Sequence, residues 1–311
     1  MEQIVVEIDL PVREKLELRK NRILPGGEDR GKRICVVTGT HGDELEGQLV
    51  AYLLNRELGE HPELLHGTVD IYPAMNPLGI NTITRRIPSL DLDMNRLFPG
   101  NENGAMADYY VAMAAEDMKG ADYAVDLHAS NIYLRELPQV RILEEFSEEL
   151  IPLAAAMNLD LVWIHSSVTV LQGTLAHALN KAGTKTLVVE LGVGMRLTKE
   201  YGKQVTAGIL NLMKKEGMWD GEVEITHHPV ISRDKVATIY AEHAGIFIPG
   251  EKQSGAVWKG EKLGIIANPA TGEDLEEVIA PSDGLLFTFR EYPVVYPGSL
   301  LARMITGGVM A

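Results

Sequence analysis

The stretch VVTGTHGDELEG, residues 36–47, decides the fold because it carries a buried strand directly into a helix. β-forming residues fill positions 34–38 and end at a glycine, and apolar residues then recur at helical spacing over 44–57. His41 and Glu44 lie at this junction. In α/β proteins ligands bind beyond the carboxyl ends of the strands, so the stretch predicts an α/β unit with a functional site here.

Strands and helices continue to alternate as far as residue 215. Apolar, β-rich runs predict strands at 34–38, 69–76, 121–128, 161–165 and 186–192. Helical periodicity predicts helices at 44–57, 105–119, 150–157, 174–182 and 205–215. This order indicates an α/β fold with a mixed, largely parallel sheet and helices on both of its faces.

After Trp219 the sequence changes to short apolar runs broken by Pro and Gly. We therefore predict an α/β domain over 1–219 and a smaller all-β domain over 220–311. The second domain contains a weak internal repeat, in which two sets of residues have the same spacing along the chain. The first set is Val257, Gly260, Leu263 and Ile266, and the second is Val295, Gly298, Leu301 and Met304.

The two halves of this repeat resemble those of a lipoyl/biotinyl-type barrel sandwich. In the carrier members of that fold, a modified lysine lies on the hairpin between the halves. Here the hairpin reads ANPATGEDLEE, and no lysine follows Lys262. The sequence therefore favours a lid or scaffold over a carrier.

Composition excludes several classes of partner. The 311-residue chain has a formal net charge of −15 and a hydrophobic content of 45 %. The negative charge argues against nucleic acid and anionic membranes as partners. No apolar run is long enough to span a membrane, and the first residues, MEQIVVEIDL, lack the pattern of a signal peptide. With a single cysteine, Cys35, inside an apolar run, we expect a cytoplasmic protein without disulfides.

His41 and Glu44 form the first candidate site. An isolated pair with this spacing is more often a loop histidine and an acid that interacts favourably with a helix dipole. Three residues is also a separation at which two side chains at a helix start can reach one ion. Zinc in hydrolytic sites commonly binds two histidines and a carboxylate and keeps one position for water. The pair therefore needs a third ligand.

His128, in VDLHAS, is the best third ligand because it ends a predicted strand. Asp126 lies two residues earlier, on the same side of the strand, and could orient the imidazole of a ligand. Taken alone, His128 would more often be an ordinary strand-end histidine. The other histidines have no comparable set of candidate residues near them in the sequence: His61, His66, His165, His177, His227, His228 and His243.

Glu190, in LVVELG, directly follows an apolar run. A carboxylate within a buried strand is costly, but at the end of the strand it becomes a candidate general base with a raised pKa. A capped or salt-bridged carboxylate at the sheet edge is the alternative.

The segment RRIPSLDLDMNRLFPG, residues 85–100, supplies cations. Arg85 or Arg86 could polarise a carbonyl group, and Asn95 with Arg96 could hold a carboxylate. The alternative is a solvated loop with local ion pairs.

Taken together, THGDE, NPLG, DMNR with FPG, DLH and VELG occur in the order of a known family. They resemble the succinylglutamate desuccinylase/aspartoacylase branch of the zinc carboxypeptidase-like superfamily over about residues 30–215. The attached β-rich unit resembles that of microbial members, including deacylases of the N-acetyl-diaminobutyrate type. No single motif is specific, but the ordered set is.

The resemblance implies one zinc ion per chain, held by His41, Glu44 and His128. It implies that Glu190 is the general base and later the proton donor, and that Asn95 and Arg96 bind the substrate carboxylate. An arginine ahead of Pro88 would stabilise the oxyanion; Arg85 and Arg86 compete for this role, and Arg86 is favoured because it is nearer to the proline. The chain after His128 does not align with the family pattern, which leaves three candidate specificity residues: Arg135, Arg141 and Arg196.

The activity that follows is zinc-dependent hydrolysis of the amide bond of a small N-acyl amino acid. A carboxypeptidase that acts on peptides is one alternative, and a non-catalytic binding protein on the same fold is another. The complete set of three ligands and Glu190 favours an enzyme. Only the family resemblance, and no feature of the sequence itself, suggests a homo-oligomer.

Overall fold

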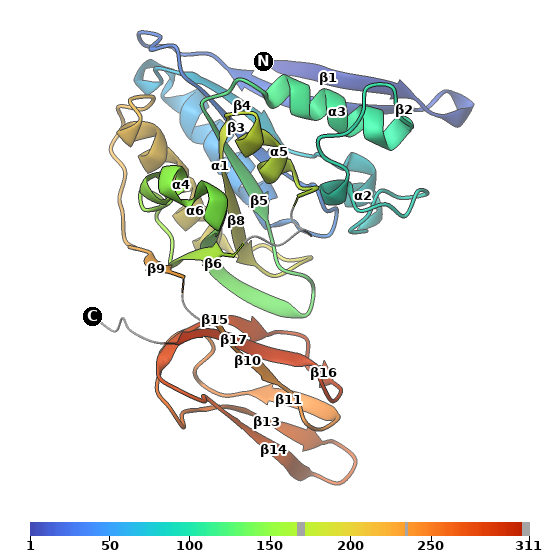
Figure 1. Ribbon diagram of the computed structural model, residues 1–311, viewed down its shortest axis with the longest axis vertical. Helices are drawn as coiled ribbons and strands as arrows, with labels where there is room; N and C mark the ends of the chain where they lie inside the picture. The colour runs from blue at the N-terminus through green and yellow to red at the C-terminus, as the bar shows by residue number, and fades with distance from the viewer. Residues whose placement is uncertain (167–171, 234–235, 307–311) are drawn as a thin grey trace.

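The five predicted strands lie within one large mixed sheet in the computed structural model, which describes residues 1–166, 172–233 and 236–306 (Figure 1). They are β3 (Arg33–Thr38), β4 (Thr68–Tyr72), β5 (Tyr123–His128), β7 (Leu161–His165) and β8 (Lys185–Gly192). β3 pairs in parallel with β4 and β5, and β5 pairs in parallel with β8. The carboxyl ends of these strands therefore meet at one edge.

Antiparallel strands extend this parallel centre on both sides. On one side, β1 (Glu2–Asp9) and β2 (Lys15–Ile23) form a hairpin, and β2 pairs with β4. On the other side, β6 (Leu134–Leu143) runs antiparallel to β8 and parallel to β7. The sequence pattern did not predict β1, β2 or β6. The mixed, largely parallel arrangement that it did predict is confirmed.

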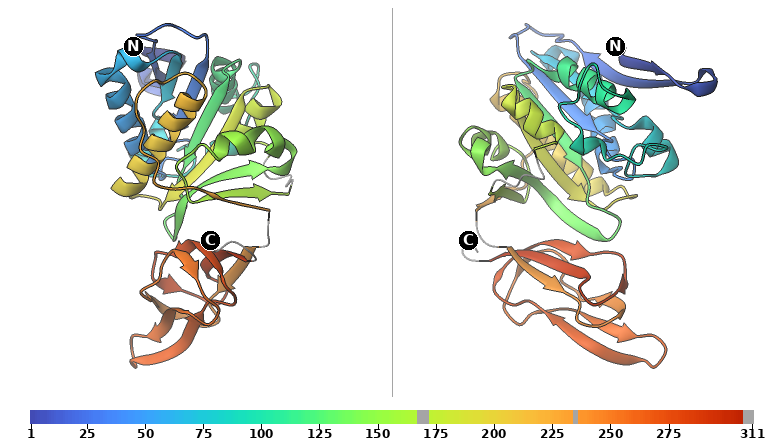
Figure 2. Two further views of the ribbon diagram at one scale, coloured as in Figure 1. Left: turned by 90° about the vertical axis from the view of Figure 1, so that its left-hand side faces the viewer. Right: turned by 45° about the vertical axis from the view of Figure 1, so that its right-hand side comes forward.

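Helices cover both faces of the sheet (Figure 2). α1 (Glu46–Glu60) and α6 (Lys199–Lys215) pack against one face in the largest apolar cluster, to which α4 (Ser147–Ala154) also contributes residues. α3 (Met106–Met118) and α5 (Leu175–Lys181) pack on the other face, where Cys35 is buried. The remaining helices are short: α2 (Pro77–Thr82) and the 3₁₀ turns η1 (Pro11–Arg13), η2 (Pro62–Leu64), η3 (Met94–Arg96) and η4 (Glu144–Phe146).

No helix within the described part of the chain combines the length and the hydropathy needed to cross a membrane.

Some element boundaries differ from the sequence prediction. β4 ends at Tyr72 and not at residue 76, because Pro73 cannot donate a hydrogen bond to a sheet ladder. α1 begins at Glu46, two residues later than predicted, so Glu44 lies in the turn before the helix. α6 begins at Lys199, six residues earlier than predicted, because its first turns are mostly polar and lack apolar periodicity.

The C-terminal part of the chain is all β, as predicted. Its strands are β10 (Val236–Tyr240), β11 (Gly245–Pro249), β12 (Gly255–Val257), β13 (Lys262–Asn268), β14 (Glu273–Ile279), β15 (Gly284–Arg290), β16 (Val294–Val295) and β17 (Leu300–Thr306). The apolar positions of the internal repeat all lie in one buried cluster. Both repeat glycines have a left-handed backbone, with φ of 83° at Gly260 and 84° at Gly298. We call residues 236–306 the β unit.

Within the β unit, the large sheet continues beside β6 through β10, β12, β15 and β17, and a second, four-stranded sheet has the order β14-β13-β11-β16 (Figure 1). β15 pairs antiparallel with the first half of β6, where Thr288 lies opposite Glu136. The chain between the two units also runs along the α/β unit, since β9 (Val230–Ser232) pairs in parallel with β7. The division after Trp219 stays a prediction.

Candidate metal and active site

A tight turn brings His41 and Glu44 together after β3. The backbone N–H of Glu44 donates to the carbonyl of His41 at 3.2 Å, so the two side chains meet through a turn and not through the first turn of α1. Gly42 allows this loop to press against α2, because a Cβ at Gly42 would lie 2.0 Å from the carbonyl carbon of Gly79. The loop that carries both residues is therefore fixed against its neighbour.

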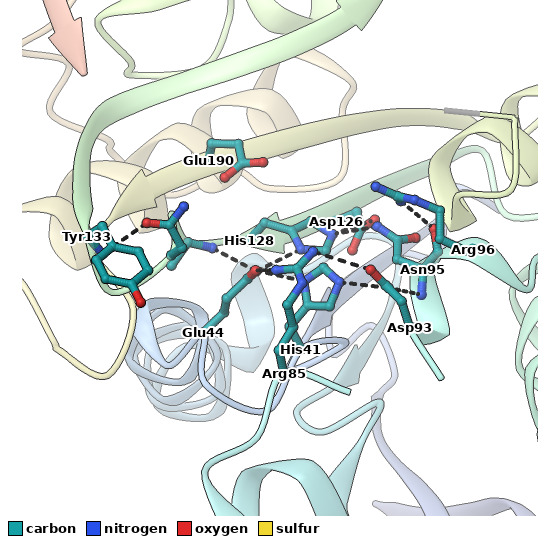
Figure 3. A network of polar contacts seen from close by, with 12 residues as sticks. His41, Glu44, Arg85, Asp93, Asn95, Arg96, Asp126, His128, Tyr133 and Glu190 are labelled. Carbon is teal, nitrogen blue, oxygen red and sulfur yellow. Dashed lines mark hydrogen bonds and ion pairs between the residues drawn. The ribbon is translucent and has the colours of Figure 1, made fainter. Parts of the chain in front are cut away.

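His128, the last residue of β5, completes a cluster of three side chains (Figure 3). One potential ligand atom from each of His41, Glu44 and His128 lies within 4.8 Å of the other two. Glu44 is central, with Oε1 2.7 Å from His41 Nδ1 and Oε2 2.9 Å from His128 Nδ1. All three side chains are nearly inaccessible to solvent, at 3–5 % exposure.

Two aspartates lie beside the outer nitrogens of the imidazoles. His41 Nε2 lies 3.2 Å from Asp93 Oδ1, and His128 Nε2 lies 3.2 Å from Asp126 Oδ2. A carboxylate at this nitrogen fixes the ring orientation and increases the basicity of the nitrogen that faces the site. The sequence argument anticipated Asp126 but missed Asp93, although Asp93 lies directly before the Asn95–Arg96 pair.

The charges of the cluster stabilise one another. Burial alone would favour neutral imidazoles, but the carboxylates of Asp93 and Glu44 outweigh it and raise the pKa of His41. For His128, burial is likewise outweighed by Asp126 and Glu44, so its pKa lies well above the ordinary value. Burial would raise the pKa of Glu44, but the two histidines hold it well below its usual range.

The donor set fits one zinc ion. Two histidines and a carboxylate are a ligand set of catalytic zinc sites. His41 Nδ1 is buried, and despite its short distance to Glu44 it has no hydrogen-bond partner among the described residues. An orphaned ring nitrogen beside a carboxylate is what a site built for a cation presents.

Glu190 lies next to this cluster because β5 and β8 are parallel neighbours, and Glu190 is directly opposite His128 in their register. It lines the same cavity as the three cluster residues. Burial raises the pKa of Glu190, and Arg141 and His128 oppose that effect. Its Oε1 atom lies 3.3 Å from a guanidinium nitrogen of Arg141.

Asn95 and Arg96 lie on the opposite side of the cluster, in η3 (Figure 3). The side-chain oxygen Oδ1 of Asn95 accepts a hydrogen bond from the backbone N–H of Leu175 at 3.0 Å. The side-chain nitrogen Nδ2 of Asn95 lies 3.4 Å from His128 Nε2. Arg96 donates to the backbone carbonyl of Asn95 at 2.7 Å. Both residues line the cavity.

The two adjacent arginines point to different places. Arg85 donates to Glu44 Oε1 at 2.8 Å and lines the cavity. Arg86 instead pairs with Asp91 at 3.0 Å, is about half exposed at 53 %, and does not line the cavity. The geometry therefore does not favour Arg86, which the sequence argument preferred, because its side chain leaves the site.

The cavity has a volume of about 540 Å³ and extends beyond Glu190. It includes Arg141, one of the three candidate specificity residues, as well as Glu136 and Arg303. Sequence reasoning missed Glu136 and Arg303, and no local motif marks either residue. Arg135 pairs with Glu291, and the remaining candidate, Arg196, donates to a neighbouring backbone carbonyl; neither lines the cavity.

Two of the histidines that the sequence argument set aside, His165 and His177, also line the cavity. Burial and the nearby cations Arg141 and Arg303 lower the pKa of His165 to about 4, so this imidazole is neutral near neutral pH. His177 lies 3.4 Å from Glu145. Neither belongs to the three-residue cluster.

The family model of the succinylglutamate desuccinylase/aspartoacylase catalytic domain matches residues 30–215. The chain belongs to this family.

A curated relative is the N-alpha-acetyl-L-2,4-diaminobutyric acid deacetylase of Halomonas elongata, which is 25 % identical over 226 residues. The match covers 70 % of this chain and 65 %, less than two thirds, of the relative's length.

Solved structures share the fold across nearly the whole chain. A succinylglutamate desuccinylase/aspartoacylase from Rhodobacter sphaeroides has a TM-score of 0.78 at 23 % identity and covers 99 % of this chain and 96 % of its own. The product-bound ectoine utilization protein of Ruegeria pomeroyi has a TM-score of 0.80 at 20 % identity. The match covers 97 % of this chain and 93 % of that protein. A metallo-carboxypeptidase from Burkholderia cenocepacia is more distant, with a TM-score of 0.53 at 16 % identity over 68 % of this chain and 63 % of its own.

Proposed function

We propose that this protein hydrolyses the amide bond of a small N-acyl amino acid and that it does so with one zinc ion per chain. The observation that carries the proposal is the convergence of His41, Glu44 and His128 in one cavity with Glu190, which lies opposite His128 in the sheet. A ligand triad beside a partly buried carboxylate is an arrangement that suits metal-assisted hydrolysis.

In this proposal His41, Glu44 and His128 hold the metal ion. Zinc in such a site acts as a Lewis acid that polarises a carbonyl group and makes water acidic enough to ionise near neutral pH. Glu190 accepts a proton from the attacking water and later donates it to the departing amine. The partly buried position of Glu190 and its raised pKa support both roles, because a carboxylate with a raised pKa is a better base and can also hold a proton.

Arginines and an amide orient the substrate. We assign stabilisation of the oxyanion to Arg85 and not to Arg86, because only Arg85 contacts Glu44 and lines the cavity. One well-placed donor of this kind is worth about 3 kcal/mol of transition-state stabilisation. Asn95 and Arg96 bind the carboxylate of the amino acid, and Leu175 supports this role by fixing the orientation of the Asn95 amide.

The first experiment is to measure the metal content of the protein, purified without added metal, by mass spectrometry. We expect one zinc per chain, and hydrolysis of at least one member of a panel containing N-acetyl-L-aspartate, N-succinyl-L-glutamate and Nα-acetyl-L-2,4-diaminobutyrate. Preference for dipeptides would instead support a carboxypeptidase. A zinc-loaded protein that cleaves neither class would support a binding protein, and failure to bind zinc after reloading would contradict the proposal itself.

Substitutions can distinguish the role of a metal ligand from that of the general base. Glu190→Gln should keep zinc and lose about a hundredfold or more in kcat, as expected when a general base is removed. His128→Ala should lose the metal. His243→Ala is the matched control, because this histidine is 53 % exposed and lies in the β unit. A His128→Ala protein with full zinc occupancy, or a Glu190→Gln protein with wild-type kcat, would remove the corresponding residue from the proposal.

A further inference from the structure

A fully buried carboxylate lies where the β unit meets the α/β unit. Glu136, in β6, is 1 % exposed and is opposite Thr288 of β15 in the register of the two strands. Its Oε2 atom accepts hydrogen bonds from Thr288 Oγ1 at 2.8 Å and from Gln139 Nε2 at 2.6 Å. Thr288 and Gln139 are both 0 % exposed. The β unit therefore supplies one of the two hydrogen bonds that hold this oxygen.

The other oxygen of Glu136 faces two guanidinium groups. Its Oε1 atom lies 3.2 Å from Arg141 and 3.6 Å from Arg303, which belongs to β17 of the β unit. Apolar residues of similar size would fill a strand junction at a lower cost than a buried carboxylate with two cations. This cost suggests a role for Glu136 other than packing.

A bulge in β6 puts Glu136 and Arg141 on the same side of the sheet. In a regular strand, residues five apart face opposite ways. The pairing of β6 with β8 shifts between Glu136 and Gln139, around Pro138, so that β6 has one residue more than β8 there. The extra residue reverses the alternation, and proline is tolerated at such a bulge. The bulge thus creates the contact between Glu136 and Arg141.

Arg141 connects this group to the catalytic carboxylate. One guanidinium nitrogen lies 3.2 Å from Glu136 Oε1, and the other lies 3.3 Å from Glu190 Oε1. The guanidinium carbon also lies 5.6 Å from the ring centroid of Trp163, on the neighbouring strand β7. Arg141 is therefore held from two sides while it contacts Glu190.

We propose that the β unit positions the general base: Thr288 fixes Glu136, Glu136 fixes Arg141, and Arg141 engages Oε1 of Glu190, which leaves Oε2 for proton transfer. This inference rests on the proposed function of Glu190. Thr288, Glu136 and Arg141 are positioning residues. The β unit is then a structural part of the active site, although it contributes no metal ligand.

The test compares two substitutions at Thr288, made in the full-length, zinc-loaded protein. Thr288→Val keeps the shape of the side chain but removes the hydroxyl, and Thr288→Ser keeps the hydroxyl. On the panel substrate that the unmodified protein cleaves fastest, we expect Thr288→Val to lose about tenfold in kcat, the effect of one hydrogen bond to a charged group. KM and zinc content should stay within twofold of wild type, and Thr288→Ser should recover most of the rate.

A control and a second variant keep the test decisive. Thr271→Val makes the same chemical change in the exposed turn between β13 and β14 and should leave kcat unchanged. If Thr288→Val does not fold, Arg303→Gln, at a partly exposed position 3.6 Å from the same carboxylate, should lower kcat in the same direction.

The outcomes separate this inference from the proposed function. If Glu190→Gln is inactive while Thr288→Val, or Arg303→Gln in its place, keeps the wild-type kcat, only the inference is overturned. If Glu190→Gln itself keeps the wild-type kcat, the role of Glu190 fails and the inference fails with it. A loss of kcat in Thr288→Val that Thr288→Ser does not recover would also overturn it, because the hydroxyl would not be the cause.

Discussion

Glu190 is subject to opposing electrostatic influences from several elements. Burial is the largest and raises its pKa above 4.5. Arg141 and His128 lower the pKa, whereas Glu44 and Glu136 raise it further. A base must be ionised to act, so the rate should fall as the pH falls through the raised pKa of Glu190. The acidic limb of the pH–rate profile therefore reports the balance of these influences together with the field of the bound metal ion.

Arg141→Met tests this balance at the scale of one residue. Removing the cation removes an influence that lowers the pKa of Glu190, so the pKa should rise and the acidic limb of kcat/KM should move to higher pH. A bound metal ion adds its own field, but that field is common to both proteins and cancels in the comparison. The measurement is kcat/KM between pH 4 and 8, with Arg196→Met as control because Arg196 does not line the cavity. A shift to lower pH would contradict the assignment of Glu190 as the base.

The local sequence was enough to predict the site residues that lie at or just after the ends of strands. His41, Glu44, His128 and Glu190 follow or end apolar runs, and the topology of a parallel sheet then brings such residues together. The distinction between Arg85 and Arg86 could not be predicted, because adjacent residues in an irregular loop follow no periodicity.

Glu136 and Arg303 could not be predicted either. Arg303 reaches the cavity only because β17 and β15 extend the sheet beyond β6, a pairing between segments more than 140 residues apart. No local pattern records such a contact.

At the scale of elements, the position of the metal ligands depends on the loop from β3 to α1. This loop packs directly on α2, which is capped by Asn76 accepting the backbone N–H of Gly79 at 2.9 Å. A methyl group at Gly42 would meet the backbone of Gly79 and could be relieved only by moving one of the two elements.

Gly42→Ala should therefore lower both stability and zinc affinity. We expect a loss of about 2 kcal/mol or more in the free energy of unfolding, as for other overpacked sites, and zinc binding at least tenfold weaker. Gly59→Ala is the matched control: Gly59 lies within α1 and has open space around it, so alanine should stabilise the protein by about 0.5 kcal/mol. Denaturant unfolding and competition with a zinc chelator measure the two effects. Equal zinc affinity in both variants would show that the contact with Gly79 does not place the ligands.

Elements with strong local periodicity could be predicted, and those shaped by tertiary pairing could not. β7 was predicted to the residue, because LVWIH is a short, bounded apolar run. β6 was not recognised, because the polar residues Glu136, Gln139 and Arg141 interrupt its pattern and Pro138 lies inside it. Arg141 contacts Glu190 and Glu136 contacts Arg141, so the part of the strand that local pattern could not predict is the part that lies at the site.

At the scale of the whole molecule, the two units share apolar packing as well as the sheet. Leu137, Leu161, Phe287 and Ile305 form a buried cluster that we call the junction core. It contains residues of β6 and β7 from the α/β unit and of β15 and β17 from the β unit. Phe287 is 1 % exposed, and its ring lies edge-on to Trp163 at 5.3 Å. Because Thr288 directly follows Phe287, the packing of the junction core also sets the position of the hydroxyl that holds Glu136.

Two Phe→Ala substitutions can separate the junction from the rest of the β unit. Phe287→Ala removes a ring from the junction core, and Phe247→Ala removes one from the separate core of the β unit. Each should cost about 3 kcal/mol or more of stability, because both rings are almost completely buried. Well below the unfolding temperature, however, Phe287→Ala should lower kcat more than Phe247→Ala, since Phe287 itself lies in β15 next to Thr288, whereas Phe247 reaches this strand only through the ring of Phe289. The measurements are calorimetric unfolding and kcat at a temperature where both variants are fully folded. Equal kcat values would mean that the β unit stabilises the protein without positioning its base, and a greater loss in Phe287→Ala would tie catalysis to the junction between the units.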